Sequence, residues 1–305
     1  MIDTLTQMAL MIAIGLAWRS LTPAGLSAER VRPILTSLVL YVFLPALVLE
    51  VLWQAPVGVN SVKFSIIGIT CIVASTALAA ITGLLLRMPK PRLGALILAS
   101  AFANVTYLGL PVLQETFGPW ARSVAIQMDF FAASPMVFTL GVWVAKKLGT
   151  HEEVKAQAWW RYFNIPPFWA AGVAVALNIY QVPMPTWLAG TLAKLAAGVT
   201  PLMLIALGLA LNWRSLHGRV AGYMLPVVLV KLAAMPAMAW LLVQFLPLPG
   251  EQAAAAVLEM AMPSMVLGLV FCDRYRLDSE LFAMAVTVTT ALSFITLPFW
   301  YRLLT

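Results

Sequence analysis

Residues 99–117 constrain the fold more than any other stretch, because polar and helix-breaking residues interrupt an apolar run long enough to span a membrane. The interrupting residues are Asn104, Thr106, Tyr107, Gly109 and Pro111. Proline lacks a backbone N–H and clashes with the preceding turn, so we expect the helix to kink or break near Pro111. Backbone groups freed in hydrocarbon need partners, so such a break must be buried in protein or line a cavity.

A second interrupted run lies about half a chain later, at residues 259–264, where Pro263 and Ser264 follow Glu259. Two interrupted spans at corresponding places in two halves of a chain are the best sequence indication of a transporter's binding site. The pair of interruptions therefore indicates transport across a membrane.

The composition supports a membrane protein, since 62% of the 305 residues are hydrophobic and only 10% are charged. A soluble domain needs more polar surface than this. Helices rise 1.5 Å per residue and hydrocarbon is roughly 30 Å thick, so ten apolar runs are candidate spans. These runs cover residues 2–19, 34–53, 62–86, 93–117, 121–145, 165–180, 186–212, 220–245, 251–271 and 281–303. We predict an all-α membrane protein with ten transmembrane helices, of which the fourth and ninth are broken.

The basic residues alternate between the connections that join these runs. Odd-numbered connections hold 14 of the 19 lysines and arginines, whereas the opposite side holds three. The positive-inside rule then places the odd-numbered connections in the cytoplasm and both termini outside. The basic excess therefore reports orientation in a membrane. It is not a nucleic-acid surface, because the sequence has no basic groove with interleaved aromatic residues.

The longest hydrophilic stretch, residues 146–164, separates five runs from five. Its Thr150 and Glu153 have the spacing of a capping box, which predicts a short interfacial helix on the cytoplasmic surface. We expect residues 1–145 to form a first five-helix repeat, 146–164 a linker and 165–305 a second repeat. An odd number of spans per half inverts the second repeat relative to the first.

Internal similarity favours this inverted repeat. The segment FLPALVL at residues 43–49 resembles VTPLMLI at 199–205, 156 positions later, and Pro111 and Pro263 lie 152 positions apart. Two similar offsets are the pattern of a duplicated unit. The alternative is chance, since the chain has 20 prolines and membrane helices are rich in them.

Five charged residues fall inside predicted spans, away from the first and last few residues: Glu50, Asp129, Lys194, Lys231 and Glu259. Each costs roughly 2.5–3.5 kcal/mol at a helix centre, so each is expected to face a cavity or a partner. Glu50 and Lys194 lie near the outer ends of their spans. Asp129, Lys231 and Glu259 lie deeper and are candidates for proton coupling or, alternatively, for a structural charge pair.

The interrupted runs predict an anion site. They cross the membrane in opposite directions, so half-helices that restart near Pro111 and Pro263 would both point their N-termini at the middle of the membrane. Free N–H groups and the positive dipole end favour an anion there. Donors nearby are Asn104, Thr106, Tyr107 and Ser264. The sequence therefore predicts a buried site for a carboxylate.

Catalytic, metal and cofactor chemistry is not expected. The two histidines, His151 and His217, fall in cytoplasmic connections, and Cys71 and Cys272 have no metal-ligand spacing. No zinc-protease, Walker or dinucleotide motif occurs.

The segment NVTYLGLP at residues 104–111 resembles the N-x-x-x-L-G-x-P signature of the auxin efflux carrier family. This family includes plant auxin exporters and bacterial carriers often called malonate transporters. Pro263, Pro201 and Gly208 are also similar to the family's pattern. The resemblance covers the whole chain. It implies the fold shared with bile acid–sodium symporters and sodium–proton antiporters, in which helices four and nine of two inverted repeats cross at their breaks.

The resemblance also implies an elevator mechanism, in which spans one, two, six and seven form a scaffold and the other spans carry the site. Family binding residues carried over by motif are Asn104, Gly109, Pro111 and Pro263. Such a scaffold commonly forms a homodimer. The chain departs from the plant members in its short linker and in having Ser264, rather than an amide, after Pro263. The identity of the substrate is therefore not carried over.

We expect a secondary carrier of a small organic anion, embedded in the lipid of a cell inner membrane. Two alternatives stay open. One is a sodium-coupled symporter of the bile acid type, which would need a denser cluster of oxygen ligands at the crossing. The other is a membrane receptor or structural protein, which would not readily explain two broken helices.

Overall fold

The computed structural model describes residues 2–149, 165–211 and 221–305, and these residues are mostly helical. The predicted linker helix with its Thr150 capping box, His151 and His217 lie outside the described residues. Within the described ranges there is no β-strand beyond one isolated bridge. The all-helical prediction is confirmed for this part of the chain.

Six helical stretches are long and apolar enough to cross a membrane. They are Ala28–Gln54, Val59–Leu85, Ala121–Leu148, Thr186–Ala210, Met224–Phe245 and Ser279–Leu304. Two shorter apolar helices, α1 (Ile2–Leu21) and α10 (Pro166–Ile179), match the first and sixth predicted runs. The fourth and ninth runs are interrupted. The fourth comprises α5 (Lys90–Ala101) and α6 (Leu110–Phe117), and the ninth comprises α15 (Gln252–Met260) and α16 (Gly268–Tyr275).

Most of the long stretches are built from shorter helices. The first joins α2 (Ala28–Leu38) to α3 (Leu44–Gln54), and α4 (Val59–Leu85) is continuous. The third joins α7 (Ala121–Met128), α8 (Ser134–Met136) and α9 (Val142–Leu148). Next come α11 (Thr186–Ala197) with α12 (Val199–Ala210), then α13 (Met224–Val228) with α14 (Met235–Phe245), and finally α17 (Ser279–Leu304).

Several of these joints are π-helical turns that directly precede a proline. The turns at Val39–Phe43, Val105–Gly109, Asp129–Ala133 and Leu229–Ala234 are each followed by a helix with proline at its second residue. Proline lacks the N–H for an α-helical bond and clashes with the carbonyl four residues before it. A π turn is wider and gives room for the ring. Proline therefore widens these helices without breaking them.

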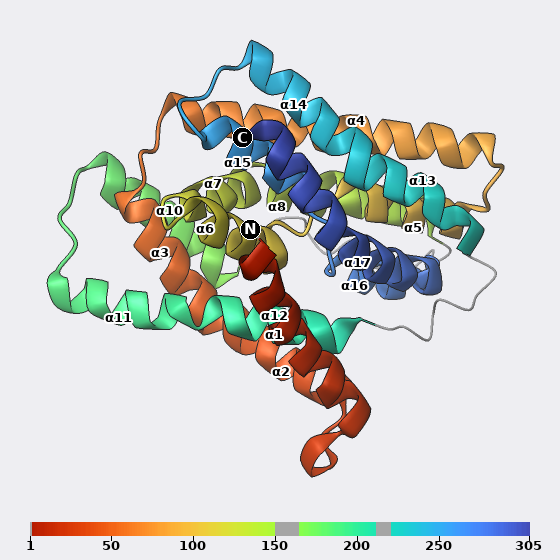
Figure 1. Ribbon diagram of the computed structural model, residues 1–305, viewed down its shortest axis with the longest axis horizontal. Helices are drawn as coiled ribbons and strands as arrows, with labels where there is room; N and C mark the ends of the chain where they lie inside the picture. Colours follow the sequence, from red (N-terminus) through yellow and green to blue (C-terminus); the bar gives the residue numbers. More distant parts are fainter. Residues whose placement is uncertain (1, 150–164, 212–220) are drawn as a thin grey trace.

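The helices pack in two groups (Figure 1), and each group draws on both halves of the chain. In the first group, α1 packs on α12, α2 on α12, and α3 on α10 and α11. In the second group, α4 packs on α5 and α14, α14 on α15, α6 on α7, and α17 on α5 and α13. In Figure 1 the first group lies below and to the left of the second.

Glycines bring α1 and α12 of the first group into backbone contact. A Cβ atom on Gly15 would lie 2.2 Å from the carbonyl oxygen of Ile205, and one on Gly208 would lie 2.1 Å from that of Ile12. Small residues allow this close approach where no hydrophobic effect drives helices together. Gly208, which the family resemblance singled out, is thus a packing residue.

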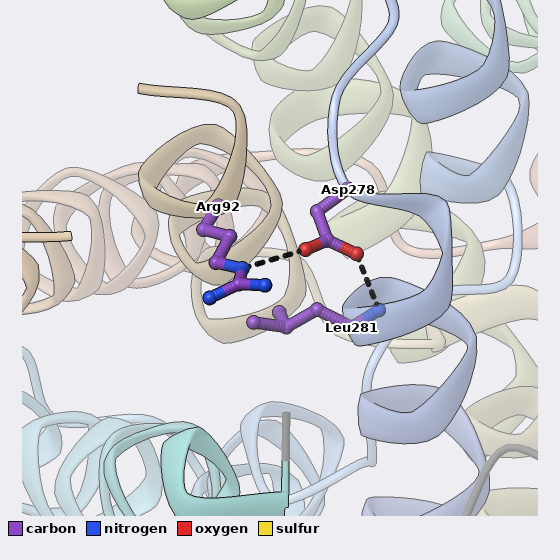
Figure 2. A network of polar contacts seen from close by, with 3 residues as sticks. All are labelled: Arg92, Asp278 and Leu281. Carbon is purple, nitrogen blue, oxygen red and sulfur yellow. Dashed lines mark hydrogen bonds and ion pairs between the residues drawn. The ribbon is translucent and has the colours of Figure 1, made fainter. Parts of the chain in front are cut away.

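Connections that follow odd-numbered runs meet at one end of the molecule. Figure 2 shows Asp278, the N-cap of α17, accepting hydrogen bonds from Arg92 Nε and from the Leu281 N–H, each at 3.0 Å. The Arg92 guanidinium also lies 5.6 Å from the ring centre of Tyr223. Residues from the third and ninth connections and from the start of the eighth run therefore share one end.

Connections that follow even-numbered runs meet at the opposite end. Lys63 Nζ donates to the Pro247 carbonyl at 2.6 Å, and Trp53 Nε1 donates to the Val182 carbonyl at 2.8 Å. Glu50, at the end of α3, is 3.2 Å from Arg122 at the start of α7. The expectation that Glu50 lies near the end of its span is confirmed, and the Glu50 carboxylate forms an ion pair with Arg122.

Candidate functional site

The two interrupted runs meet at their breaks. Between α5 and the turn at Val105–Gly109, and between α15 and α16, the backbone is non-helical. The Asn104 N–H donates to the Pro263 carbonyl at 2.8 Å, and the Met265 N–H donates to the Phe102 carbonyl at 3.0 Å. The two segments thus form a short antiparallel bridge. Each break supplies partners for backbone groups that the other leaves free, as a hydrocarbon environment requires.

The expectation that each half-helix restarts near its proline agrees with the start of α6 at Leu110, next to Pro111, but is wrong for Pro263. Pro111 is the second residue of α6 and follows a π-helical turn, so helical structure resumes at Val105. Pro263 lies in the non-helical segment, and α16 begins at Gly268. The π turn accommodates Pro111, and pairing with the other segment fixes where each break lies.

Pro111 and Pro263 are consequently not equivalent positions. α5 ends at Ala101 and α15 at Met260, so the ends of the first half-helices are 159 positions apart, against 152 for the two prolines. The offset between the prolines therefore does not support the repeat.

A cavity of about 290 Å³ lies beside the crossing, between the two helix groups. Asn104, Thr106 and Tyr107 line it from the restart of the first interrupted helix. Asn104 is 3% exposed, and its Nδ2 has no hydrogen-bond partner among the described residues. A buried amide donor without a partner costs free energy unless a ligand or water satisfies it. The cavity thus contains a donor available to a bound molecule.

Asp129 is the acidic residue of this cavity. It begins a π-helical turn, is 7% exposed, and accepts hydrogen bonds from the Thr106 hydroxyl and, at 2.7 Å, from Ser134 Oγ. A π turn brings residues five apart together, which explains how Ser134 reaches Asp129. Sequence reasoning with α-helical periodicity missed Ser134, whose only signal is its place beside Pro135.

The remaining cavity wall comes mostly from apolar residues that sequence analysis did not single out. They are Leu40, Leu44, Val105, Phe130, Phe138, Ile165, Pro167, Phe168, Met265, Val266 and Leu267. Phe168 of the first helix group stacks edge-on against Phe130, at 5.2 Å between ring centres, and against Phe138, at 6.4 Å. Nothing in the sequence distinguishes these phenylalanines from the others, because the chain has 14.

Four of the predicted substrate-binding residues, Gly109, Pro111, Pro263 and Ser264, are not part of the cavity lining. A Cβ atom on Gly109 would lie 2.1 Å from Glu259 Oε1, so this glycine makes room for a carboxyl group. Ser264 Oγ donates to the Ala99 carbonyl at 2.7 Å, and its N–H donates to Thr289 Oγ1 at 3.1 Å. Pro263 accepts the Asn104 N–H, and Pro111 is buried in α6. These contacts hold the crossing together.

Lys231 and Glu259 are both fully buried, and neither lines the cavity. Lys231 Nζ contacts Met235 Sδ at 2.7 Å and the Met260 carbonyl at 3.5 Å. No ion pair within 4.0 Å joins Lys231 to Glu259. Both Glu259 oxygens lack a hydrogen-bond partner among the described residues. The structural charge pair that the sequence left open is therefore not formed in this conformation.

Interrupted helices that cross beside a partly polar cavity define a class of membrane protein, the transporters. Residues 3–301 match the family described as membrane transport protein, so the chain belongs to this family. The match confirms the resemblance to the auxin efflux carriers. It also identifies a transport protein rather than an enzyme, acting on a substrate in a lipid bilayer.

Two archaeal proteins are similar over nearly their whole length. An uncharacterized transporter of Methanothermobacter thermautotrophicus is 29% identical over 304 residues, which cover 98% of this chain and 96% of the relative. An uncharacterized transporter of Methanocaldococcus jannaschii is 24% identical over 289 residues, covering 90% of this chain and 91% of the relative. Both relatives support a membrane transporter, and neither name specifies a substrate.

Proposed function

We propose that this protein is a secondary carrier of a small organic anion and that it binds a carboxylate in the cavity at the crossing. The observation that carries the proposal is the buried, unpartnered amide of Asn104 in that cavity. The Tyr107 side chain adds a hydroxyl, and the helical segment that starts at Val105 adds the positive end of its dipole. Together these groups can satisfy a carboxylate without a metal ion.

We propose that Asp129 couples anion binding to the binding of a proton. A carboxylate on Asp129 and an anion in the same cavity repel each other at short range in a low-dielectric environment. A proton on Asp129 removes this repulsion, so proton and anion favour each other's binding. Carrying both also reduces the net charge that moves through hydrocarbon.

Binding and uptake by purified protein test the proposal. Acetate, benzoate and succinate are the probes, and neutral benzamide is the control. A ligand that binds only the folded protein stabilises it by about 2.7 kcal/mol at 100 times its Kd. We expect at least one carboxylate to raise the melting temperature and to accumulate in proteoliposomes, and benzamide to do neither. Wild-type protein that responds to none of the anions would contradict the proposal.

We extend the proposal to an elevator motion of the second helix group against the first. The cavity lies between the groups, so sliding would expose it on alternate sides. The Glu50–Arg122 ion pair joins the groups at the end opposite Arg92, whereas the Arg19–Glu29 and Arg92–Asp278 pairs each lie within one group. A cleavable thiol crosslink between Glu50→Cys and Arg122→Cys is expected to stop uptake, and its reduction to restore uptake. Full uptake by the crosslinked protein would exclude the motion.

For the arrangement in the membrane we propose ten spans in two inverted repeats, 1–145 and 165–305, joined by the linker 146–164. Six long stretches, two shorter helices and two interrupted runs supply the spans. Connections after odd-numbered runs carry the basic excess, and two of them, the third and the ninth, meet at one end; this supports our proposal that this end is cytoplasmic and that both termini lie outside an inner membrane. We also propose a homodimer formed through the first helix group, which would keep that group fixed while the second group moves. The mass of the detergent-solubilised particle tests for the dimer.

Cysteine labelling in intact cells tests this orientation. Glu251 and Lys90 are both exposed and lie in connections at opposite ends. A membrane-impermeant maleimide is expected to label Glu251→Cys and to leave Lys90→Cys unlabelled until the cells are opened. The native cysteines, Cys71 and Cys272, are buried and contribute little background. The reverse labelling pattern would invert the topology.

A further inference from the structure

A second cavity, of about 200 Å³, adjoins the cavity at the crossing. The two cavities share Leu40, Tyr107, Val266 and Leu267 in their walls. Tyr107 therefore stands between two spaces, one holding Asn104 and Asp129 and the other holding Arg32. Apart from these four shared residues, the lining of the second cavity, which includes Arg32 and Thr36, has no role in the site described above.

The position of Arg32 follows from helix geometry. Arg32 and Thr36 are four residues apart on α2, and Leu40 follows at the same spacing in the turn that continues the helix, so the three share one face. All three line the second cavity. Tyr107 lines the same cavity, so the guanidinium and the wall between the two cavities face one space.

The charge of Arg32 is available to a ligand. Within residues 2–149, 165–211 and 221–305, no carboxylate pairs with Arg32 within 4.0 Å, whereas the nearby Glu29 pairs with Arg19 at 3.3 Å. The cavity at the crossing contains Asp129 but no lysine or arginine among its described lining residues. An anion bound there gains no ion pair from the described lining of its own cavity, whereas the adjoining cavity offers the cation of Arg32.

We propose that Arg32 forms an anion subsite that binds the substrate's carboxylate on its way between the cytoplasmic end and Asn104. A guanidinium binds a carboxylate through two parallel N–H···O bonds, which a lysine cannot reproduce. Tyr107 then separates this subsite from the crossing. The proposal rests on the function proposed above and assigns a residue that neither the helix break nor the family motif indicates.

Charge-matched variants on α2 test the subsite. Arg32→Gln removes the cation, Arg32→Lys keeps the charge but loses the planar fork, and Arg30→Gln removes a charge two residues away that lines neither cavity. Benzoate and succinate are the probes, measured as affinity in detergent and as uptake into liposomes of phosphatidylcholine alone or with added anionic phosphatidylglycerol. We expect Arg32→Gln to weaken binding of the transported anion about tenfold or more, as loss of a charge-assisted bond predicts. The affinity of Arg32→Lys should lie between those of Arg32→Gln and wild type, and the affinity of Arg30→Gln should equal that of wild type.

Salt dependence separates a binding role from a structural one. Wild-type affinity is expected to fall as ionic strength rises, and Arg32→Gln to lose most of that dependence with an unchanged melting temperature. Equal affinities and equal salt dependence in Arg32→Gln and Arg30→Gln would overturn the subsite. So would a defect confined to liposomes with anionic lipid, because Arg32 would then bind a lipid headgroup. If wild-type protein binds neither probe, the proposed function fails and the subsite fails with it.

Discussion

Asn104→Ala is expected to weaken anion binding severely while leaving the folded protein as stable as wild type, or slightly more stable. The Asn104 Nδ2 is buried without a partner among the described residues, so its removal breaks no bond that supports the fold. A hydrogen bond to a charged group contributes about 1.5–3 kcal/mol. Its loss corresponds to a tenfold to roughly 150-fold weaker affinity. The variant keeps its backbone N–H, so the bond to Pro263 at the crossing survives.

The measurement is the melting temperature of each purified variant with and without benzoate and succinate. Gln244→Ala is the control, because its amide is exposed and donates only to the Trp240 carbonyl of its own helix. We expect the anion-dependent rise to disappear in Asn104→Ala and to persist in Gln244→Ala. An Asn104→Ala protein that keeps wild-type affinity would remove the crossing from the site. A lower melting temperature without ligand would instead assign Asn104 a structural role.

The sequence predicted that two runs are interrupted, because polar and helix-breaking residues in hydrocarbon leave few alternatives. It also indicated that Asn104, Thr106 and Tyr107 belong together, and all three line the cavity. It did not predict where the breaks fall. That position depends on the pairing of Asn104 with Pro263 and of Phe102 with Met265, which are far apart in sequence. Local propensity alone would have put the breaks at the prolines.

The rest of the site depends on packing between the two helix groups. Ser134 reaches Asp129 through a π turn, whose spacing differs from that of an α-helix. Leu40 and Phe168 enter the cavity from the first helix group, and no motif marks either residue. Gly109 matched the family signature, yet its close neighbour is the Glu259 carboxyl rather than the cavity. A motif residue can thus support a site without lining it.

Asp129→Asn is expected to remove the pH dependence of anion binding and uptake. In wild type, lowering the pH adds a proton to the coupling carboxyl and removes its repulsion of the anion, so affinity should rise as pH falls, by up to about tenfold per unit. The amide mimics the protonated carboxyl at every pH. The amide oxygen can accept a hydrogen bond from one hydroxyl, and the amide N–H can donate one to the other hydroxyl oxygen. The contacts with Thr106 and Ser134 are therefore retained. The variant should bind the anion tightly at both low and high pH.

Glu259→Gln is the matched comparison, because sequence alone could not choose between these two deep carboxyls. Asp129 lines the cavity whereas Glu259 faces Gly109, so repulsion of the bound anion should act mainly through Asp129. Proteoliposome uptake under an imposed pH gradient, with and without sodium, distinguishes the cases. A gradient response lost in Glu259→Gln but kept in Asp129→Asn would move the coupling site to Glu259. If both variants respond as wild type does, neither carboxyl couples protons. A dependence on sodium would then indicate a symporter, and independence of both ions a uniporter.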